Sequence, residues 1–274
     1  MSGTFELTIR PRKGWQAVDL KEAYLYSELL LFLIWRDIKI RYRQTLLGGL
    51  WAVLQPFLAM TIFAFIFNRL AHVQSDGPPY KLFAFAGLAP WTFFSTAVTQ
   101  SSNSLLANQQ LVSKIYFPRI FIPLGAIFAL LVDLILSLGL LAVLMIYYRW
   151  ALTPAVAWLP LFMVFAILAA AGTGLILSAL NVRFRDVKYA VPFMIQMGLF
   201  LTPVIYPTHY VPARWQLLMG LNPMTGVVVG FRHALLGTPI SWDVTGVSLA
   251  TCLLLFVVGL FVFRRLETEF ADIL

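Results

Sequence analysis

LIWRDIKIRYRQTLLGGLWAVLQP, residues Leu33–Pro56, joins a charged half to an uncharged half. On a helical wheel the first half places Arg36, Lys39 and Arg43 on a narrow arc, and the opposite arc is apolar. An amphipathic helix with a basic face is typical of segments that lie in the plane of a membrane surface. The apolar run after Gly48-Gly49 is long enough to cross a bilayer. The stretch therefore predicts a helix on a membrane surface, followed by one that crosses the membrane.

The composition supports the membrane interpretation. The chain has 274 residues, of which 60% are hydrophobic and 12% charged, and its mean hydropathy is +0.83. A net charge of +8 does not indicate nucleic-acid binding, because the basic residues sit in short clusters between apolar runs. The single cysteine, Cys252, lies in such a run, and the three histidines lack metal-ligand spacing, so neither a disulfide framework nor a metal site is expected.

Six apolar stretches follow the first helix, each near the ~20 residues that a spanning helix needs. They cover residues 47–68, 83–101, 121–147, 155–180, 189–206 and 243–263. We therefore predict an all-α polytopic membrane protein with an interfacial helix at 28–43. A polar segment, 1–27, would precede one transmembrane domain, 28–264, and a short tail, 265–274, would follow it. The second stretch runs into the polar sequence TQSSNSLLANQQ, so its end is expected near residue 101.

The distribution of basic residues predicts the orientation. With the N-terminus inside, the inner segments hold fifteen lysines and arginines and the outer segments hold five, which accounts for all twenty. Cytoplasmic loops of membrane proteins carry the excess of these residues. Both termini are therefore expected in the cytoplasm.

Two connections between the spans are unusual. The inner segment Leu105–Pro118 has apolar residues at helical spacing but is too polar to cross a membrane, so it is either a surface connector or a docking segment. The outer segment Pro207–Ser241 holds two apolar pieces, 212–221 and 224–236, which Asn222-Pro223 separates. Each piece is too short to span and too apolar for water, which favours two short re-entrant helices.

Asp133 is the only carboxylate inside a predicted span, which makes it a functional candidate. No lysine or arginine lies deep in a span to pair with it, but Ser137 could accept a hydrogen bond from its protonated form. Asp133 is thus either a structural polar contact or part of a pathway. A separate row of small residues predicts close helix packing, within the subunit or across a dimer. This row is Ala166, Ala170, Gly174 and Ser178.

Large side chains in the first and fifth spans are candidates for lining a pathway, because flat aromatic rings can stack on the C–H faces of sugars. Such residues also face lipid or core in any membrane protein, so both interpretations stay open. The candidates are Trp51, Phe57, Phe63, Phe193, Met197 and Phe200.

The basic residues of the first helix also have two interpretations. They attract anionic lipid headgroups at about 1 kcal/mol each, or they bind the pyrophosphate of a lipid-linked substrate, with arginine bidentate. These residues are Arg36, Lys39, Arg41 and Arg43. The chain has no glycine-rich phosphate loop and no set of catalytic residues, so it is not expected to bind ATP or to be an enzyme by itself.

Several blocks, in this order, resemble type-2 ABC transporter permeases, and most closely the branch that exports lipid-linked O-antigen and related cell-surface polysaccharides. The blocks are GWQAVDL (14–20), ELLLFLIWRDIKIRYRQTLLG (28–48), KIYFPRIFIPL (114–124), NVRFRDV (181–187), TPVIYP (202–207) and LNPMTGVVVGFRHALLG (221–237). In the block KIYFPRIFIPL, relatives often have Pro-Arg-Glu after the aromatic residue. Here Pro118-Arg119 is followed by Ile120. A contact made by that glutamate is therefore not carried over.

The resemblance implies a homodimer of six-span subunits in the bacterial inner membrane, in contact with membrane lipids. It implies two separate ATP-binding cassette subunits, which bind ATP and Mg, and a polysaccharide substrate on polyprenyl pyrophosphate. It also implies an ATPase-coupling helix within Leu105–Arg119, where the candidate residues are Leu105, Asn108, Gln109, Gln110, Lys114, Ile115, Phe117 and Arg119. A periplasmic gate is implied within Pro207–Ser241. Its candidate residues, with the preceding tyrosine, are Tyr206, Tyr210, Trp215, Asn222, Pro223, Phe231 and Arg232.

Two rival functions remain at this stage. One is export of a small drug or lipid, as other type-2 permeases perform. The other is a membrane scaffold that anchors a polysaccharide-assembly complex without transporting anything.

Overall fold

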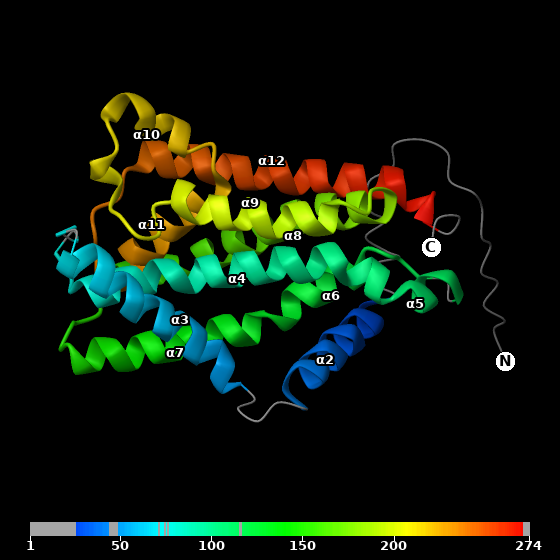
Figure 1. The fold of residues 1–274 in the computed structure, drawn as a ribbon, viewed down its shortest axis with the longest axis horizontal. Helices are drawn as coiled ribbons and strands as arrows, with labels where there is room; N and C mark the ends of the chain where they lie inside the picture. Colours follow the sequence, from blue (N-terminus) through cyan, green and yellow to red (C-terminus); the bar gives the residue numbers. More distant parts are fainter. Residues whose placement is uncertain are drawn as a thin grey trace, which may run out of the picture.

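The structure, a computed structural model, describes residues 26–43, 49–70, 72–73, 75, 77–114 and 117–270. Within these ranges every regular element is a helix (Figure 1). The elements in chain order are α2 (Ser27–Arg43), α3 (Leu50–Phe63), the π-helix η1 (Ala64–Leu70), α4 (Tyr80–Ala107), α5 (Gln109–Lys114), α6 (Phe121–Ala129), α7 (Leu131–Tyr147), the 3₁₀-helix η2 (Pro154–Trp158), α8 (Leu159–Arg183), α9 (Val187–Leu201), the 3₁₀-helix η3 (Thr208–Tyr210), α10 (Ala213–Met219), α11 (Pro223–Leu236) and α12 (Trp242–Glu267).

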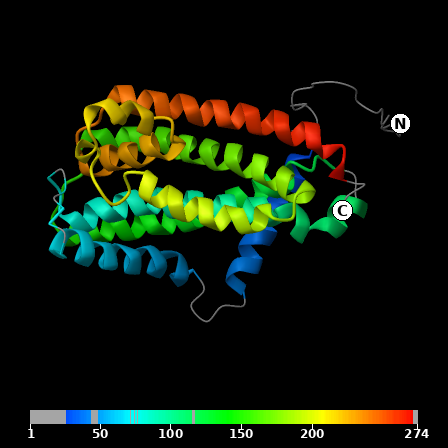
Figure 2. The same ribbon diagram turned by 45° about the horizontal axis from the view of Figure 1, so that its top comes forward.

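Five helical stretches of the described chain are long and apolar enough to cross a membrane: Leu50–Leu70, Tyr80–Ala107, Phe121–Tyr147, Pro154–Arg183 and Trp242–Glu267. They form one elongated bundle (Figures 1 and 2). One end of the bundle carries α5 and the last turn of α12, and the other end carries α10 and α11 (Figure 1). We call these the α5 end and the α10 end.

The fifth predicted span, 189–206, is helical up to residue 201, and only its last five residues, 202–206, lie outside a helix. α9 ends at Leu201 after 15 residues, which is roughly 22 Å at about 1.5 Å per residue and short of the ~30 Å hydrocarbon core. Thr202 is extended because the residue before a proline, here Pro203, is disfavoured in a helix. The four residues that follow α9, Thr202 to Ile205, are buried inside the protein.

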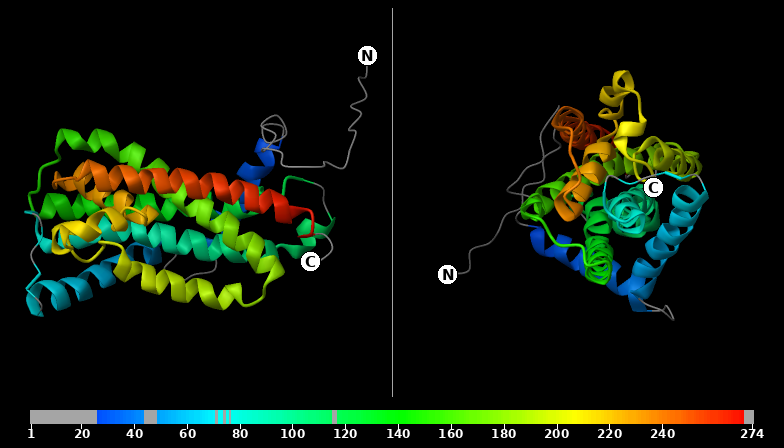
Figure 3. Two further views of the ribbon diagram at one scale, coloured as in Figure 1. Left: turned by 90° about the horizontal axis from the view of Figure 1, so that it is seen from above. Right: turned by 90° about the vertical axis from the view of Figure 1, so that its left-hand side faces the viewer.

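The expected end of the second span, residue 101, is wrong. α4 has 28 residues, ends at Ala107 and is the most buried of the span-length helices. Its polar residues stay helical because their side chains donate to carbonyls one turn earlier, as Thr99 does to Ser95 and Asn103 does to Thr99. The end-on view in Figure 3 places α4 in the middle of the bundle.

Small residues bring the other long helices together. All four members of the predicted row Ala166, Ala170, Gly174 and Ser178 are buried within the protomer. Gly174 faces Ser101 of α4, and the neighbouring Gly172 faces the backbone of α12 at Leu255 and Gly259. The row therefore packs helices within the subunit.

The α8–α12 crossing gives a stability prediction. A Cβ at Gly172 would lie 2.6 Å from the carbonyl carbon of Leu255, so Gly172→Ala must push the helices apart. We expect a loss of about 1–3 kcal/mol in the free energy of unfolding, measured as a lower Tm in detergent. Gly139→Ala is the matched control, because nothing lies within 4 Å of its Cβ and alanine favours the helix by up to about 1 kcal/mol. Equal Tm values for the two variants would contradict this packing.

α2 matches the predicted helix 28–43 within one residue. It runs obliquely across the bundle axis (Figures 1 and 2) and packs on α6, where its one fully buried side chain, Leu33, lies against Gly125. The predicted span 121–147 consists of α6 and α7, which join at Leu130. The GWQAVDL block, Gly48 and Ile115 lie outside the described residues.

Candidate functional site

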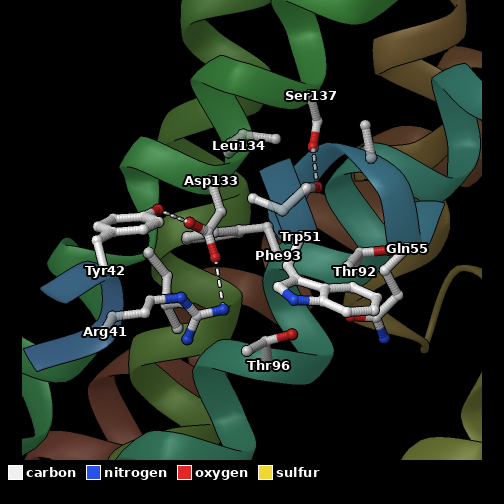
Figure 4. A pocket seen from close by; sticks show the side chains of 13 residues that line it. Arg41, Tyr42, Trp51, Gln55, Thr92, Phe93, Thr96, Asp133, Leu134 and Ser137 are labelled. Atoms are coloured by element: carbon white, nitrogen blue, oxygen red, sulfur yellow. Dashed lines mark hydrogen bonds and ion pairs between the residues drawn. The ribbon is translucent and has the colours of Figure 1, made fainter. Parts of the chain in front are cut away.

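Asp133 is paired with two residues of α2, which corrects the sequence interpretation. One carboxylate oxygen lies 2.6 Å from Nη2 of Arg41, and the other accepts a hydrogen bond from the Tyr42 hydroxyl (Figure 4). Ser137 instead donates to the Ala52 carbonyl at 3.3 Å. The expected Ser137 contact is therefore wrong, because the partners come from a helix outside the spans. We call Arg41, Tyr42 and Asp133 the α2–α7 clasp.

The clasp is partly shielded from solvent. The Asp133 side chain is 14% exposed and that of Arg41 31%. Burial, together with the hydrogen bond to Asp133, raises the pKa of Tyr42 to about 12. The Tyr42 hydroxyl therefore keeps its proton at neutral pH and remains a donor to the carboxylate.

The other basic residues of α2 do not join the clasp. Arg36 donates to its neighbour Asp37 at 2.8 Å, and the ammonium of Lys39 lies 5.3 Å from the ring centre of Trp35. Arg43 is exposed. The structure thus divides the four predicted basic residues into one clasp residue, Arg41, and three at the helix surface.

α4 has a polar face that the sequence interpretation missed. Its partly exposed residues recur at helical spacing, and they are Thr92, Ser95, Thr96, Thr99 and Asn103. We call them the polar face of α4. On one flank of this face, Phe93 lines a cavity with α3, and on the other flank Trp91 contacts Gly198 of α9. The face therefore lies between α3 and α9.

Two hydroxyl groups on this face, those of Ser95 and Thr99, remain acceptors. Ser95 donates to the Thr92 carbonyl at 3.0 Å and Thr99 donates to the Ser95 carbonyl at 2.8 Å. Each proton is thereby used within the helix, and the oxygen lone pairs stay available to a polar ligand. The sequence pattern of the polar face is a Ser, Thr or Asn every three to four residues. From the sequence alone this polar pattern predicts the end of a span, which is wrong.

The aromatic candidates divide between the two helices that flank the polar face of α4. Phe193, Met197 and Phe200 follow each other at helical spacing on α9, and all three are exposed. The α3 candidates point in different directions, because Trp51 and Phe57 are exposed whereas Phe63 packs against the core and lies edge-on to Phe67. Only the α9 set forms one continuous surface.

The predicted docking segment forms a projecting helix. α5 exposes Gln109, Gln110 and Lys114 at the end of the bundle (Figure 1). Leu105 and Phe117 anchor it in a core cluster that also contains Leu33 of α2. The two other described candidates are held by hydrogen bonds, because the Asn108 amide donates to Ser104 and the Arg119 guanidinium donates to the Glu267 carbonyl of α12 at 2.7 Å.

The segment after α9 is clamped at the α10 end. Arg232 of α11, which is 3% exposed, donates to the carbonyls of Phe83, Pro203 and Val204 at 3.1, 2.6 and 2.5 Å. The Tyr80 hydroxyl of α4 donates to the Ile205 carbonyl at 2.6 Å. We call Arg232 and its three carbonyls the arginine clamp.

The two predicted short helices occur as α10 and α11, with the break at Asn222-Pro223. Asn222 caps α11 by accepting from the Met224 amide at 3.0 Å and donates to Thr202 at 2.8 Å. Trp215 and Tyr210 are exposed, whereas Phe231 is fully buried. Tyr206 is partly buried and donates to the Phe200 carbonyl. Phe231 and Arg232 are therefore core residues and do not lie at an exposed mouth.

The fold and these surfaces define a helical, multi-pass membrane protein with a projecting helix at one end and a clamped helical pair at the other. Among the described residues no three His, Cys, Asp or Glu side chains are placed to hold a metal ion. The ABC-2 type transporter family matches residues 28–236. The chain belongs to this family.

Curated relatives match between 78% and 92% of the chain. An O-antigen export system permease protein of Klebsiella pneumoniae is 31% identical over 92% of this chain and 96% of its own length. The protein of the same name from Myxococcus xanthus is 32% identical over 78% of this chain and 82% of its own length. A polysialic acid transport protein of Escherichia coli is 28% identical over 83% of this chain and 87% of its own length.

Proposed function

We propose that the chain is the membrane permease subunit of an ABC transporter that exports a lipid-linked polysaccharide across the bacterial inner membrane. Relatives named for O-antigen export and for polysialic acid transport support a polysaccharide substrate. As a member of the ABC-2 family the chain is a transport subunit, not a catalytic one. We propose that a separate ATP-binding cassette protein would bind ATP and Mg.

The observation that carries transport is the polar face of α4. A hydroxyl and amide surface along the most buried span-length helix is unfavourable against lipid, so it faces a polar pathway. Its acceptor oxygens suit the hydroxyl groups of sugars better than an apolar drug. The exposed face of α9 then forms one wall of the pathway, where rings can stack on sugars.

A second copy of the chain completes this pathway. α3 and α9 flank the polar face of α4 and are largely uncovered within the protomer. In a homodimer they would close the pathway on the open side, and two ATP-binding cassette subunits would bind the two copies. The six-span topology holds if α9 and the buried segment up to Ile205 cross the membrane together.

The charges support an orientation with the α5 end in the cytoplasm. Lys114, Arg183 and Arg264 lie in the last turns of their helices at this end. α5 would then contact the ATPase, and α10 with α11 would form the periplasmic gate as a re-entrant pair. Arg36, Lys39 and Arg43 would contact anionic lipid or the pyrophosphate carrier at the cytoplasmic entrance.

Loss of the chain from its own cells tests this function. We expect completed glycan on its lipid carrier to accumulate on the cytoplasmic side, because synthesis continues while export stops. Accessibility of the glycan to an added glycosidase, before and after the cells are permeabilised, measures its side. A drop in glycan synthesis without accumulation would favour a scaffold, and unchanged surface glycan would contradict the proposal.

A further inference from the structure

A cavity of about 200 Å³ lies where α2, α3, α4 and α7 meet, beside the α2–α7 clasp (Figure 4). Trp51 and Gln55 of α3 line it, together with Thr92 and Thr96 from the polar face of α4. We call it the clasp cavity. It therefore adjoins the proposed pathway but lies within a single protomer.

The charge balance of the cavity is close to neutral. The Arg41 guanidinium and the Asp133 carboxylate are 2.6 Å apart and compensate each other. A pyrophosphate would have to approach this carboxylate, which repels it. A ligand without charge can instead accept from an N–H group of the Arg41 guanidinium, which has five, and donate to a lone pair of the Asp133 carboxylate. The pair therefore favours a neutral polyol over a phosphate.

The remaining walls offer both a ring and hydroxyl partners. Trp51 lines the cavity and is 52% exposed. The negative face of an indole attracts the slightly positive C–H groups of a sugar ring. Gln55, Thr92 and Thr96 supply amide and hydroxyl groups beside it. A pyranose has C–H groups on its ring faces and hydroxyl groups around its edge. It can therefore contact an aromatic ring and neighbouring polar side chains at the same time.

The size selects a single sugar unit. Pockets for drug-sized molecules are roughly 300–1,000 Å³, and the clasp cavity is smaller than that at about 200 Å³. That is space for one ring, and a disaccharide would extend out of it.

The geometry points to a monosaccharide subsite: the clasp cavity binds one uncharged sugar ring, which stacks on Trp51 and hydrogen-bonds to the Arg41–Asp133 pair. This inference rests on the proposed function for the source of the sugar, which would be a unit of the passing glycan. It assigns to Asp133 a ligand-binding role that the sequence left open. Each protomer would carry one such subsite.

Saturation-transfer NMR on the protein in lipid nanodiscs tests the subsite. The probes are the methyl pyranosides of glucose, galactose, mannose and N-acetylglucosamine, with sodium pyrophosphate as competitor. We expect saturation of the ring C–H protons of at least one glycoside, and no displacement by an equal concentration of pyrophosphate. Absence of any glycoside signal, or displacement by pyrophosphate, would overturn the assignment.

Two variants locate the signal. Trp51→Ala should raise the Kd of the bound glycoside at least about tenfold, and Trp51→Phe should restore most of the binding. Trp35→Ala is the matched control, because Trp35 is similarly exposed, at 57%, but does not line the cavity. Binding that survives in Trp51→Ala, or that is lost equally in Trp35→Ala, would overturn the subsite.

Asp133→Asn separates sugar from phosphate recognition. The variant leaves the Arg41 charge uncompensated, so it should lose glycoside binding and gain binding of pyrophosphate. Unchanged glycoside binding would show that the pair is not part of the subsite. Glycan export by the parent protein without glycoside binding would refute the subsite and leave the proposed function standing. Glycoside binding without glycan export would support the subsite and refute the proposed function.

Discussion

Replacement of Arg232 by methionine should leave little folded protein. The substitution removes a charged donor from three buried carbonyls, those of Phe83, Pro203 and Val204, and it also removes the guanidinium that lies 3.5 Å from the ring centre of Phe83. A hydrogen bond from a charged group contributes about 1.5–3 kcal/mol, and an unsatisfied buried carbonyl costs about 1–3 kcal/mol. We expect a total loss of about 3–5 kcal/mol, seen as a lower Tm and a lower yield of monodisperse protein.

Two further variants test whether the arginine clamp is the cause. Arg232→Lys keeps the charge but cannot reach three carbonyls at once, so its Tm should be intermediate. Gly87→Ala should also lower the Tm, because a Cβ there would lie 2.6 Å from Nη2 of Arg232. Arg214→Gln removes an exposed arginine of α10 and should have no effect. A parental Tm for Arg232→Met would refute the clamp.

Two positive charges on α5 should uncouple transport from ATP hydrolysis. Gln109→Arg with Gln110→Arg changes two exposed side chains at the surface that we propose contacts the ATPase. Because neither side chain is buried, the Tm of the isolated subunit should stay at the parental value. The rate of glycan export should fall at least about tenfold, since the contact must re-form in every cycle.

Thr268→Arg is the control for this variant. Thr268 is exposed and follows α12 at the same end of the bundle, but it lies outside α5. Export by this control should match the parent, and ATP hydrolysis by the assembled complex should continue in the double variant without transport. Parental export by the double variant would exclude α5 as the coupling contact.

The elements with strong local patterns were predictable from the sequence. The basic amphipathic pattern placed α2 within one residue, and Asn222-Pro223 marked the break between α10 and α11, where Asn222 caps the second helix. The end of α4 was missed because hydropathy treats Ser, Thr and Asn as breaking a span. In the structure these residues satisfy their hydrogen bonds within the helix itself.

Contacts between distant segments were not predictable. The partner of Asp133 is Arg41, on a helix that sequence patterns placed at the membrane surface. Arg232 was counted among outer-loop charges, although its position in the apolar run VVVGFRHALL is a signal that it is buried. The sequence does not show that Arg232 binds three carbonyls, because that depends on where α4 and the segment after α9 are placed.

Transport in a reconstituted system tests the central claim most directly. Liposomes would contain this chain, its ATP-binding cassette partner and a fluorescent glycan on polyprenyl pyrophosphate, and a membrane-impermeant quencher would report which leaflet holds the glycan. We predict that ATP moves the glycan to the leaflet opposite the ATPase, and that a non-hydrolysable ATP analogue does not. ATP hydrolysis without movement of the glycan, in complexes that contain the folded chain, would contradict the account.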